Sequence, residues 1–349
     1  MEHGADIETY QIYSKEKLID FSSNINPLGI PPLIESKIKG DINNLTRYPD
    51  IKYRELKKDV SIYLNCDKEN VIVGNGAVEI IDSFTMIVKR VIVFTPSFSE
   101  YEKRAKVHNK EIVRLKFDEN FNINVEDLER AIQPNDLLIL GNPNNPTGLR
   151  IDKNTLMDIY DVVRSNDAIL LLDEAFFEFS STDYDSIELF KQNKYSNICI
   201  LRAATKFFAL PGLRLGYGAS SVELVDRVND IMMPWSVNGI AESFAKYLFT
   251  DEEYILKSKE YIKNERKFLL NELRKLSNIA AYDTDANFIL IRLLNVDEEY
   301  ALKFFLNRGI LIRTCSSFIS LGKNHIRIAI KSHQDNSIIL DIFKELDKI

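Results

Sequence analysis

Lys206 stands in an apolar, turn-rich segment, residues 205–217, that directly follows a predicted strand over residues 197–201. An ammonium group is costly to bury without a partner, so partial burial lowers the pKa of a lysine and favours the neutral amine. A neutral amine can attack a carbonyl carbon and form a Schiff base. The segment therefore makes Lys206 a candidate for Schiff-base chemistry, although a lysine taken alone is more often exposed than catalytic.

Asp173 follows a continuous apolar run at residues 168–172, which is typical of a parallel strand buried on both faces. Ligands of open α/β sheets bind just outside the carboxyl ends of the strands. A carboxylate at such a strand end can pair with the protonated ring nitrogen of pyridoxal phosphate. The alternative is that Asp173 only caps the next helix.

Two turns add polar groups at strand ends. The sequence NPNNPTG at residues 142–148 follows an apolar run and predicts a rigid turn, whose asparagine amides could bind a phenolic oxygen. The sequence GNG at residues 74–76 joins a short predicted strand to a helix, and the free N–H groups at a helix start bind phosphate. Each turn taken alone is more often an ordinary connection than a site.

The elements that must position these groups follow an α/β rhythm. Strands are expected at residues 71–73, 91–94, 111–115, 137–140, 168–172 and 197–201, with helices between them. A long charged helix is expected at residues 252–277. Residues 280–349 then predict an α+β unit, with strands at 288–292, 310–313 and 326–330 and helices at 297–307 and 334–348.

The composition of the chain indicates which kinds of partner and location to expect. The chain has 349 residues and a formal net charge of −7, which argues against nucleic acid as the main partner. No apolar stretch approaches the ~20 residues of a membrane span. Three scattered cysteines and an N-terminus without signal-peptide features predict a cytoplasmic protein with free thiols. A dinucleotide-dependent oxidoreductase is disfavoured, because the glycine turn at residues 74–76 lacks the third glycine of its fingerprint.

The motifs NPNNPTG, DEA at residues 173–175 and TKFFALPGLRLGY at residues 205–217 together resemble the class I/II aminotransferases, a family of fold-type I pyridoxal-phosphate enzymes. The resemblance extends from about Asp20 to the C-terminus. It implies an α/β fold, with a large and mostly parallel-sheet αβα domain and a smaller C-terminal α+β domain. The expected division is an N-terminal arm of the small domain at 1–46, a large cofactor-binding domain at 47–251, a connecting helix at 252–279 and the small domain at 280–349.

The same resemblance implies roles for the candidate residues around pyridoxal 5′-phosphate, and no metal. Lys206 would bond to the cofactor, Asp173 would pair with its ring nitrogen, and Asn145 would bind its 3′ oxygen. The remaining cofactor-binding residues are expected to be Gly76, Ala77, Val78, Phe98, Thr205 and Arg214, with Tyr48 contributed by the neighbouring subunit of a homodimer. One departure is Phe176, where many of these enzymes have a tyrosine that donates to the 3′ oxygen.

Further segments, DFSSNINPLG at 20–29, DEAF at 173–176 and MPWSVN at 233–238, resemble the threonine-phosphate decarboxylases, a branch close to the histidinol-phosphate aminotransferases. This implies decarboxylation of L-threonine O-3-phosphate to (R)-1-amino-2-propanol O-2-phosphate in cobalamin biosynthesis. The alternative is an aminotransferase of the histidinol-phosphate or aromatic amino acid type. The small anionic amino-acid phosphate would be bound by His3, Asn24, Asn145, Arg313 and Arg327, and guanidinium groups suit carboxylate and phosphate equally.

Overall fold

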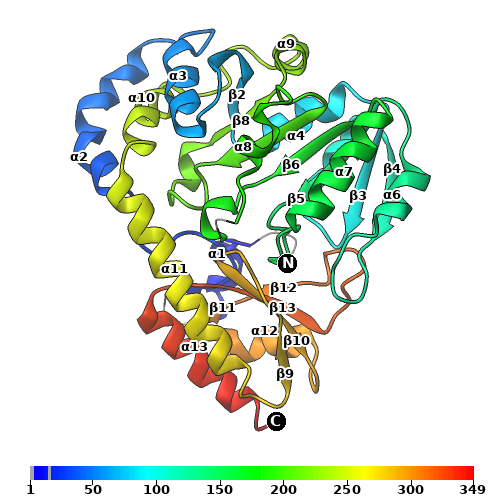
Figure 1. Ribbon diagram of the computed structural model, residues 1–349. Helices are drawn as coiled ribbons and strands as arrows, with labels where there is room; N and C mark the ends of the chain where they lie inside the picture. The colour runs from blue at the N-terminus through cyan, green and yellow to red at the C-terminus, as the bar shows by residue number, and fades with distance from the viewer. Residues whose placement is uncertain (1–3, 15–16, 182) are drawn as a thin grey trace.

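A twisted seven-stranded sheet forms the centre of the larger part of the molecule (Figure 1). The computed structural model describes residues 4–14, 17–181 and 183–349. The strands of this sheet are β2 (Val71–Asn75), β3 (Arg90–Thr95), β4 (Glu111–Lys116), β5 (Asp136–Gly141), β6 (Ile169–Asp173), β7 (Ile198–Ala203) and β8 (Leu215–Ser220). Their order is β2-β8-β7-β6-β5-β3-β4, and only the contacts of β8 with β7 and β2 are antiparallel.

Helices cover both faces of this sheet, because its central strands are apolar on both sides. In β6, Leu170 and Leu172 join one hydrophobic cluster, whereas Ile169 and Leu171 join the other. The helices that pack here are α3 (Arg54–Leu64), α4 (Ala77–Met86), α5 (Ser99–Val107), α6 (Val125–Ala131), α7 (Lys153–Ser165), α8 (Ser186–Lys191), α9 (Val222–Asn229) and α10 (Gly239–Leu248). Helices α4, α5 and α9 cover one face, and α3, α6, α7, α8 and α10 cover the other.

A second, smaller sheet is antiparallel and lies below the first in Figure 1. Its strands, in spatial order, are β12 (Arg313–Thr314), β13 (His325–Ala329), β10 (Phe288–Leu293) and β9 (Ile279–Ala281). Helices α12 (Glu298–Leu306) and α13 (His333–Leu346) belong to this part of the chain. The long helix α11 (Glu252–Leu273) runs between the two parts and packs against α13 (Figure 1). It ends four residues before the predicted boundary at 277.

The N-terminal segment pairs with the C-terminal part of the chain. Strand β1 (Ile19–Asp20) runs parallel to β11 (Ile310–Leu311). The strand predicted at residues 310–313 is interrupted at Ile312, because β11 pairs with β1 whereas β12 pairs with β13. The remaining short elements are α1 (Ile7–Gln11), α2 (Pro32–Asp41), η1 (Ile42–Thr46), η2 (Lys68–Asn70), η3 (Phe177–Phe179) and η4 (Pro211–Leu213).

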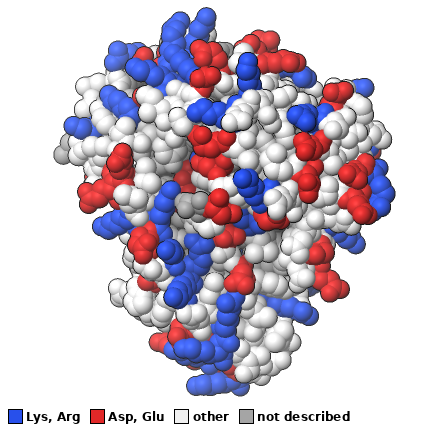
Figure 2. Space-filling view, viewed as in Figure 1, with Lys and Arg blue, Asp and Glu red and all other residues white. Residues whose placement is uncertain are grey.

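Charged side chains of both signs are interspersed over the face in Figure 2, without a continuous basic stripe. Among the described helices, none is both long and apolar enough to cross a bilayer. The division at residues 46, 251 and 279 stays a prediction. The strands of the large sheet fall between residues 71 and 220, and those of the four-stranded sheet between 279 and 329.

Candidate active site

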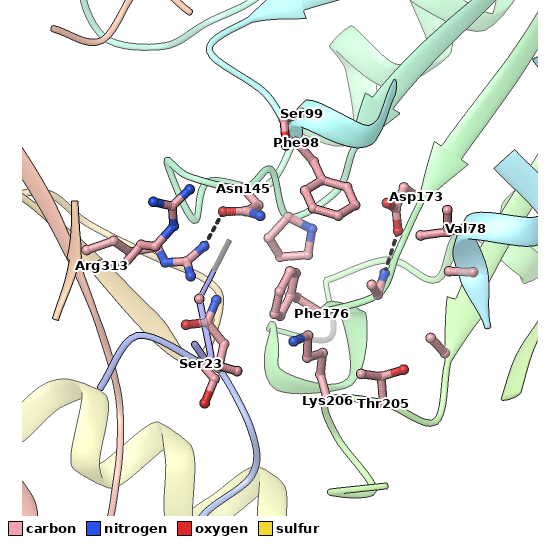
Figure 3. Close-up of a pocket in the computed structure, with 18 of the residues that line it drawn as sticks. Ser23, Val78, Phe98, Ser99, Asn145, Asp173, Phe176, Thr205, Lys206 and Arg313 are labelled. Atoms are coloured by element: carbon pink, nitrogen blue, oxygen red, sulfur yellow. Dashed lines mark hydrogen bonds between the residues drawn. The ribbon is translucent and has the colours of Figure 1, made fainter. Parts of the chain in front are cut away.

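A cavity of about 270 Å³ lies where the two sheets and the N-terminal segment meet. Strands β6 and β7 point their carboxyl ends at it, while β12 and β13 close it from the other side. The structure brings together most of the residues predicted from the sequence, and Figure 3 shows their side chains converging. The predicted residues that line the cavity are Asn24, Ala77, Val78, Phe98, Asn145, Asp173, Thr205, Lys206, Arg214, Arg313 and Arg327.

Two predicted residues do not line the cavity, and a third is not described by the structure. Gly76 precedes the cavity-lining residues of α4 without lining the cavity itself. Tyr48 is 79 % exposed and lies outside the cavity, with its ring 5.0 Å from that of Trp235. His3 lies outside the described residues.

Lys206 lies in the loop between β7 and β8 with its side chain directed into the cavity (Figure 3). The N-terminal segment fixes this loop, since the backbone N–H of Asn26 donates to the Lys206 carbonyl at 3.1 Å. Burial, followed by the positive charges of Arg327 and Arg214, lowers the pKa of the Lys206 amine to about 8. The neutral form that a nucleophilic amine requires is therefore much better populated near neutral pH than in an exposed lysine.

Asp173 ends β6 and is buried. Its Oδ2 accepts a hydrogen bond from the Tyr101 hydroxyl at 2.7 Å, and its Oδ1 accepts from the Ala175 N–H at 3.1 Å. Burial raises the pKa of the Asp173 carboxyl, and these two donors oppose the rise. The alternative role as a helix cap is not observed, because the next helical turn, η3, has Phe176 at its N-cap.

Several hydrogen-bond donors lie near the start of α4. Gly76 has a φ of +80°, and the N-cap position that it occupies makes no side-chain hydrogen bond to the first turn. The first N–H groups of a helix have no intrahelical acceptor, so those of Ala77 and Val78 suit an anion. The Arg214 guanidinium packs so closely that a Cβ on Gly76 would lie 2.5 Å from its Nη2. Thr205 lines the same cavity and adds a hydroxyl.

Arg327 joins the two sides of the cavity. Its guanidinium donates to Asn145 Oδ1, drawn as a dashed line in Figure 3, and to the Ser22 carbonyl at 2.9 Å. Burial lowers the pKa of Arg327 to about 9 and leaves it charged at pH 7. No carboxylate of the described residues forms an ion pair with Arg327, and its buried Nε has no partner among them.

Arg313 lies directly opposite Arg327 in the antiparallel register of β12 and β13. Its guanidinium donates to Ser317 Oγ at 2.8 Å and to the Thr314 carbonyl at 2.6 Å. Like charges at directly opposed positions repel. A bound anion, or two anionic groups of one ligand, would offset this repulsion.

Phe176 is buried, with its ring edge-on to Phe288 at 5.0 Å, and it lines the cavity. A phenyl ring donates no hydrogen bond. Since Arg327 occupies the oxygen of Asn145, the amide nitrogen of Asn145 is the donor that this side chain still offers. Asn24, also at the cavity, has a buried side-chain oxygen without a partner among the described residues.

A network of buried charged residues lies next to the carboxyl end of β6. Arg202 donates to Glu174 Oε2 at 2.9 and 3.0 Å and to Asp185 at 2.7 Å. Burial raises the pKa of Glu174 to about 7, although Arg202 opposes the rise. Asn142 of the NPNNPTG turn donates to Glu174 Oε1 at 3.3 Å, so the network joins that turn to the end of β6.

Sequence reasoning missed this network and Tyr101. Tyr101 and Asp173 are 72 positions apart, and no local pattern links them. The one available signal is the spacing of Phe98 and Tyr101 across the start of a predicted helix, which puts both rings near one strand end. Within the part of the chain that the structure describes, no cluster of His, Cys, Asp and Glu is arranged to hold a metal ion.

Known proteins are similar to this chain over almost its whole length. The family model described as "Aminotransferase class I and II" matches residues 16–343. A provisionally named threonine-phosphate decarboxylase of Caldanaerobacter subterraneus subsp. tengcongensis is 41% identical over 99% of this chain and 94% of its own length. The threonine-phosphate decarboxylase of Salmonella typhimurium is 32% identical over 97% of this chain and 94% of its own.

Two further similarities bear on the reaction. The adenosylcobalamin biosynthesis bifunctional protein CobDQ of Leptospira interrogans is 30% identical over 95% of this chain, which corresponds to 39% of that protein. The crystal structure of the histidinol-phosphate aminotransferase from Clostridium acetobutylicum superposes with a TM-score of 0.91. It is 37% identical in sequence and covers 95% of this chain and 99% of that one.

Proposed function

Because the chain belongs to the class I and II aminotransferase family, we propose that it is the pyridoxal-phosphate enzyme that decarboxylates L-threonine O-3-phosphate to (R)-1-amino-2-propanol O-2-phosphate in cobalamin biosynthesis. The observation that carries the proposal is the opposed pair Arg313 and Arg327 at one side of the cavity that holds Lys206 and Asp173. Such a cavity suits an amino acid with two anionic groups.

The residues fit pyridoxal 5′-phosphate. The uncapped start of α4 and Arg214 suit its phosphate, and the Phe98 ring at the cavity suits its ring. Asp173 has two neutral donors and no ion pair among the described residues, so its carboxylate remains available to a protonated ring nitrogen. Lys206 supplies an amine of lowered pKa for covalent attachment.

The two arginines take different anions in this proposal. Arg327 bonds to Asn145, the residue proposed to bind the 3′ oxygen of the cofactor, so it lies near the reacting carbon and takes the carboxylate. Arg313 takes the phosphate together with Asn24, whose side-chain NH₂ group is the part of the amide that can donate to a phosphate oxygen. His3 remains a proposed phosphate partner on the resemblance alone.

Pyridoxal phosphate held by these residues would supply an electron sink for a bond broken at the substrate Cα. The contribution of this chain is therefore orientation. Arg327 and Arg313 hold the substrate at two points and thereby fix its rotation about the Cα–N axis. Decarboxylation would require this orientation to favour cleavage of the Cα–carboxylate bond, and transamination would require it to favour cleavage of the Cα–H bond. The Lys206 amine is the group placed to return a proton to Cα.

A second candidate function is transamination of histidinol phosphate, supported by the 37% identity to the Clostridium acetobutylicum enzyme. The same phosphate and cofactor residues would serve that reaction. Phe176 counts against it, since an aminotransferase of the usual kind has a tyrosine hydroxyl at this place.

A homodimer and a cytoplasmic location belong to the same proposal. The segments at residues 45–51 and 233–235 meet at the Tyr48–Trp235 ring contact and expose Leu45, Met233 and Ile51. An exposed apolar surface of this kind is typical of a protein–protein contact. The three cysteines are free thiols, as expected in a reducing compartment.

The experiment that tests the function is incubation of purified holoenzyme with O-phosphothreonine labelled at the carboxyl carbon. Release of labelled CO₂ and formation of the aminopropanol phosphate would support the proposal. Absence of CO₂, together with amine transfer from histidinol phosphate to 2-oxoglutarate, would replace it by the aminotransferase.

A further inference from the structure

Tyr101, on the first turn of α5, is a buried tyrosine that contacts two proposed cofactor residues. Only 2 % of its surface is exposed. Its hydroxyl donates to Asp173 Oδ2 at 2.7 Å, and its ring meets that of Phe98 edge to face, with centroids 5.6 Å apart. The side chain therefore supports the carboxylate and the stacking ring from behind.

If Tyr101 had only a structural role, its hydroxyl could bond to any nearby acceptor, such as a backbone carbonyl. Buried tyrosine hydroxyls usually find a hydrogen-bond acceptor. Tyr160, equally buried in the same part of the fold, donates to the backbone carbonyl of Ser196 at 2.9 Å. Tyr101 instead donates to a buried carboxylate that no Lys, Arg or His of the described residues pairs with.

The charged groups around Asp173 face other partners. Glu174 follows it in sequence but points to Arg202, and Lys206 and Arg214 line the cavity without an ion pair to Asp173. Burial raises the pKa of Asp173, and the Tyr101 hydroxyl is the larger of the two opposing contributions. The Tyr101 hydroxyl and the Ala175 N–H each hold one carboxylate oxygen, so together they also fix the rotation of the carboxylate plane.

We propose that Tyr101 is a positioning residue that orients the Asp173 carboxylate toward the ring nitrogen of the cofactor. This inference rests on the proposed function, because it requires that Asp173 pairs with that nitrogen. It holds equally for decarboxylation and for transamination. Removal of the hydroxyl leaves Oδ2 without its donor, so that Asp173 binds its own proton more readily and pairs less with the ring nitrogen.

The test compares wild-type holoenzyme with Tyr101→Phe. Nitrogen NMR of cofactor isotope-labelled at the ring nitrogen reports directly whether this nitrogen is protonated. We expect the signal of Tyr101→Phe to move toward that of the unprotonated ring. We also expect kcat to fall on the order of ten- to a hundredfold, with a much smaller change in KM.

Two reference variants make the outcome decisive. Tyr160→Phe removes a buried hydroxyl bond remote from Asp173 and should keep the wild-type nitrogen signal; Asp173→Asn should move it fully. If Asp173→Asn moves the signal while Tyr101→Phe only lowers the melting temperature, Tyr101 is a structural residue and the proposed function stands. If neither variant moves the signal, the role of Asp173 fails and the inference fails with it.

Discussion

At the residue scale, Lys206 is distinguished from other partly buried lysines by its place in the cavity. We expect borohydride reduction of the holoenzyme, followed by peptide mass mapping, to find the cofactor on Lys206, and Lys206→Ala to lose both the adduct and nearly all turnover. Lys331 is a suitable control, because burial lowers its pKa as well but it does not line the cavity. An adduct on Lys331, or on any other lysine, would contradict the assignment.

The same residue predicts a pH dependence. The Lys206 pKa is lowered to about 8, so the amine is mostly protonated below this pH and mostly neutral above it. Covalent capture of cofactor by the cofactor-free enzyme should therefore accelerate as pH rises toward 8 and level off above it. Stopped-flow absorbance at a series of pH values measures this rate. A rate that keeps rising to pH 10 would show an amine of ordinary pKa.

The arginine pair predicts a split in substrate preference. Arg313→Ala should remove charge-assisted hydrogen bonds to O-phosphothreonine that contribute about 1.5–3 kcal/mol. This loss corresponds to a decrease in kcat/KM of roughly tenfold to a few hundredfold. The kcat/KM for unphosphorylated threonine should stay unchanged. Arg327→Ala should lower kcat/KM for both substrates, because both have the carboxylate. Equal losses on both substrates in Arg313→Ala would show that Arg313 does not bind the phosphate.

Individual residues show where sequence reasoning ends. Lys206, Asp173 and Asn145 were predicted from motifs that mark strand ends, and the structure brings them to one cavity. Tyr101 was not predicted, because its importance lies in a contact with Asp173 that only the folded sheet creates. The opposed register of the arginine pair was also invisible, since strand pairing is not encoded by spacing alone.

At the scale of elements, the turn between β2 and α4 requires glycine at position 76 for two reasons. Gly76 has a positive φ, and a Cβ there would lie 2.5 Å from the Arg214 guanidinium. We expect Gly76→Ala to displace Arg214 and to strain the turn by about 1–2 kcal/mol, with weaker cofactor binding as the larger effect. Equilibrium dialysis of cofactor and thermal unfolding of the cofactor-free protein measure the two effects separately.

Gly212 in the neighbouring turn η4 provides the matched control, because an added Cβ would meet nothing within 4 Å and its φ is not positive. Gly212→Ala should keep wild-type cofactor affinity. If Gly76→Ala also keeps it, the start of α4 does not hold the cofactor phosphate.

Elements with strong local patterns were predicted well. Strands β5 and β6 are uninterrupted apolar runs, and both are found within one or two residues of the predicted bounds. The strand predicted at 310–313 is divided into β11 and β12, because these two pair with segments from opposite ends of the chain. Helix α8 and strand β9 were not predicted, since six residues make less than two helical turns and three residues make less than two repeats of a strand.

At the scale of the whole molecule, the cavity is built from distant parts of one chain. In the proposed homodimer, the partner chain also contributes a residue to it. Tyr48 is exposed and does not line the cavity of its own subunit. If it serves the partner's site, then in a mixed dimer of Tyr48→Ala and Lys206→Ala chains one site has both residues intact and the other has neither. Equal mixing with free exchange should then restore about a quarter of wild-type turnover, as expected for isologous dimers.

This complementation separates a shared site from mere dimerisation. Each variant should be nearly inactive before mixing, and activity should appear at the rate of subunit exchange. Tyr300, on α12, is also exposed and provides a control. The Tyr300→Ala variant should retain activity by itself. A dimer in which mixing restores nothing, or a verified monomer with full turnover, would show that each chain completes its own site and that the exposed Tyr48–Trp235 surface serves another purpose.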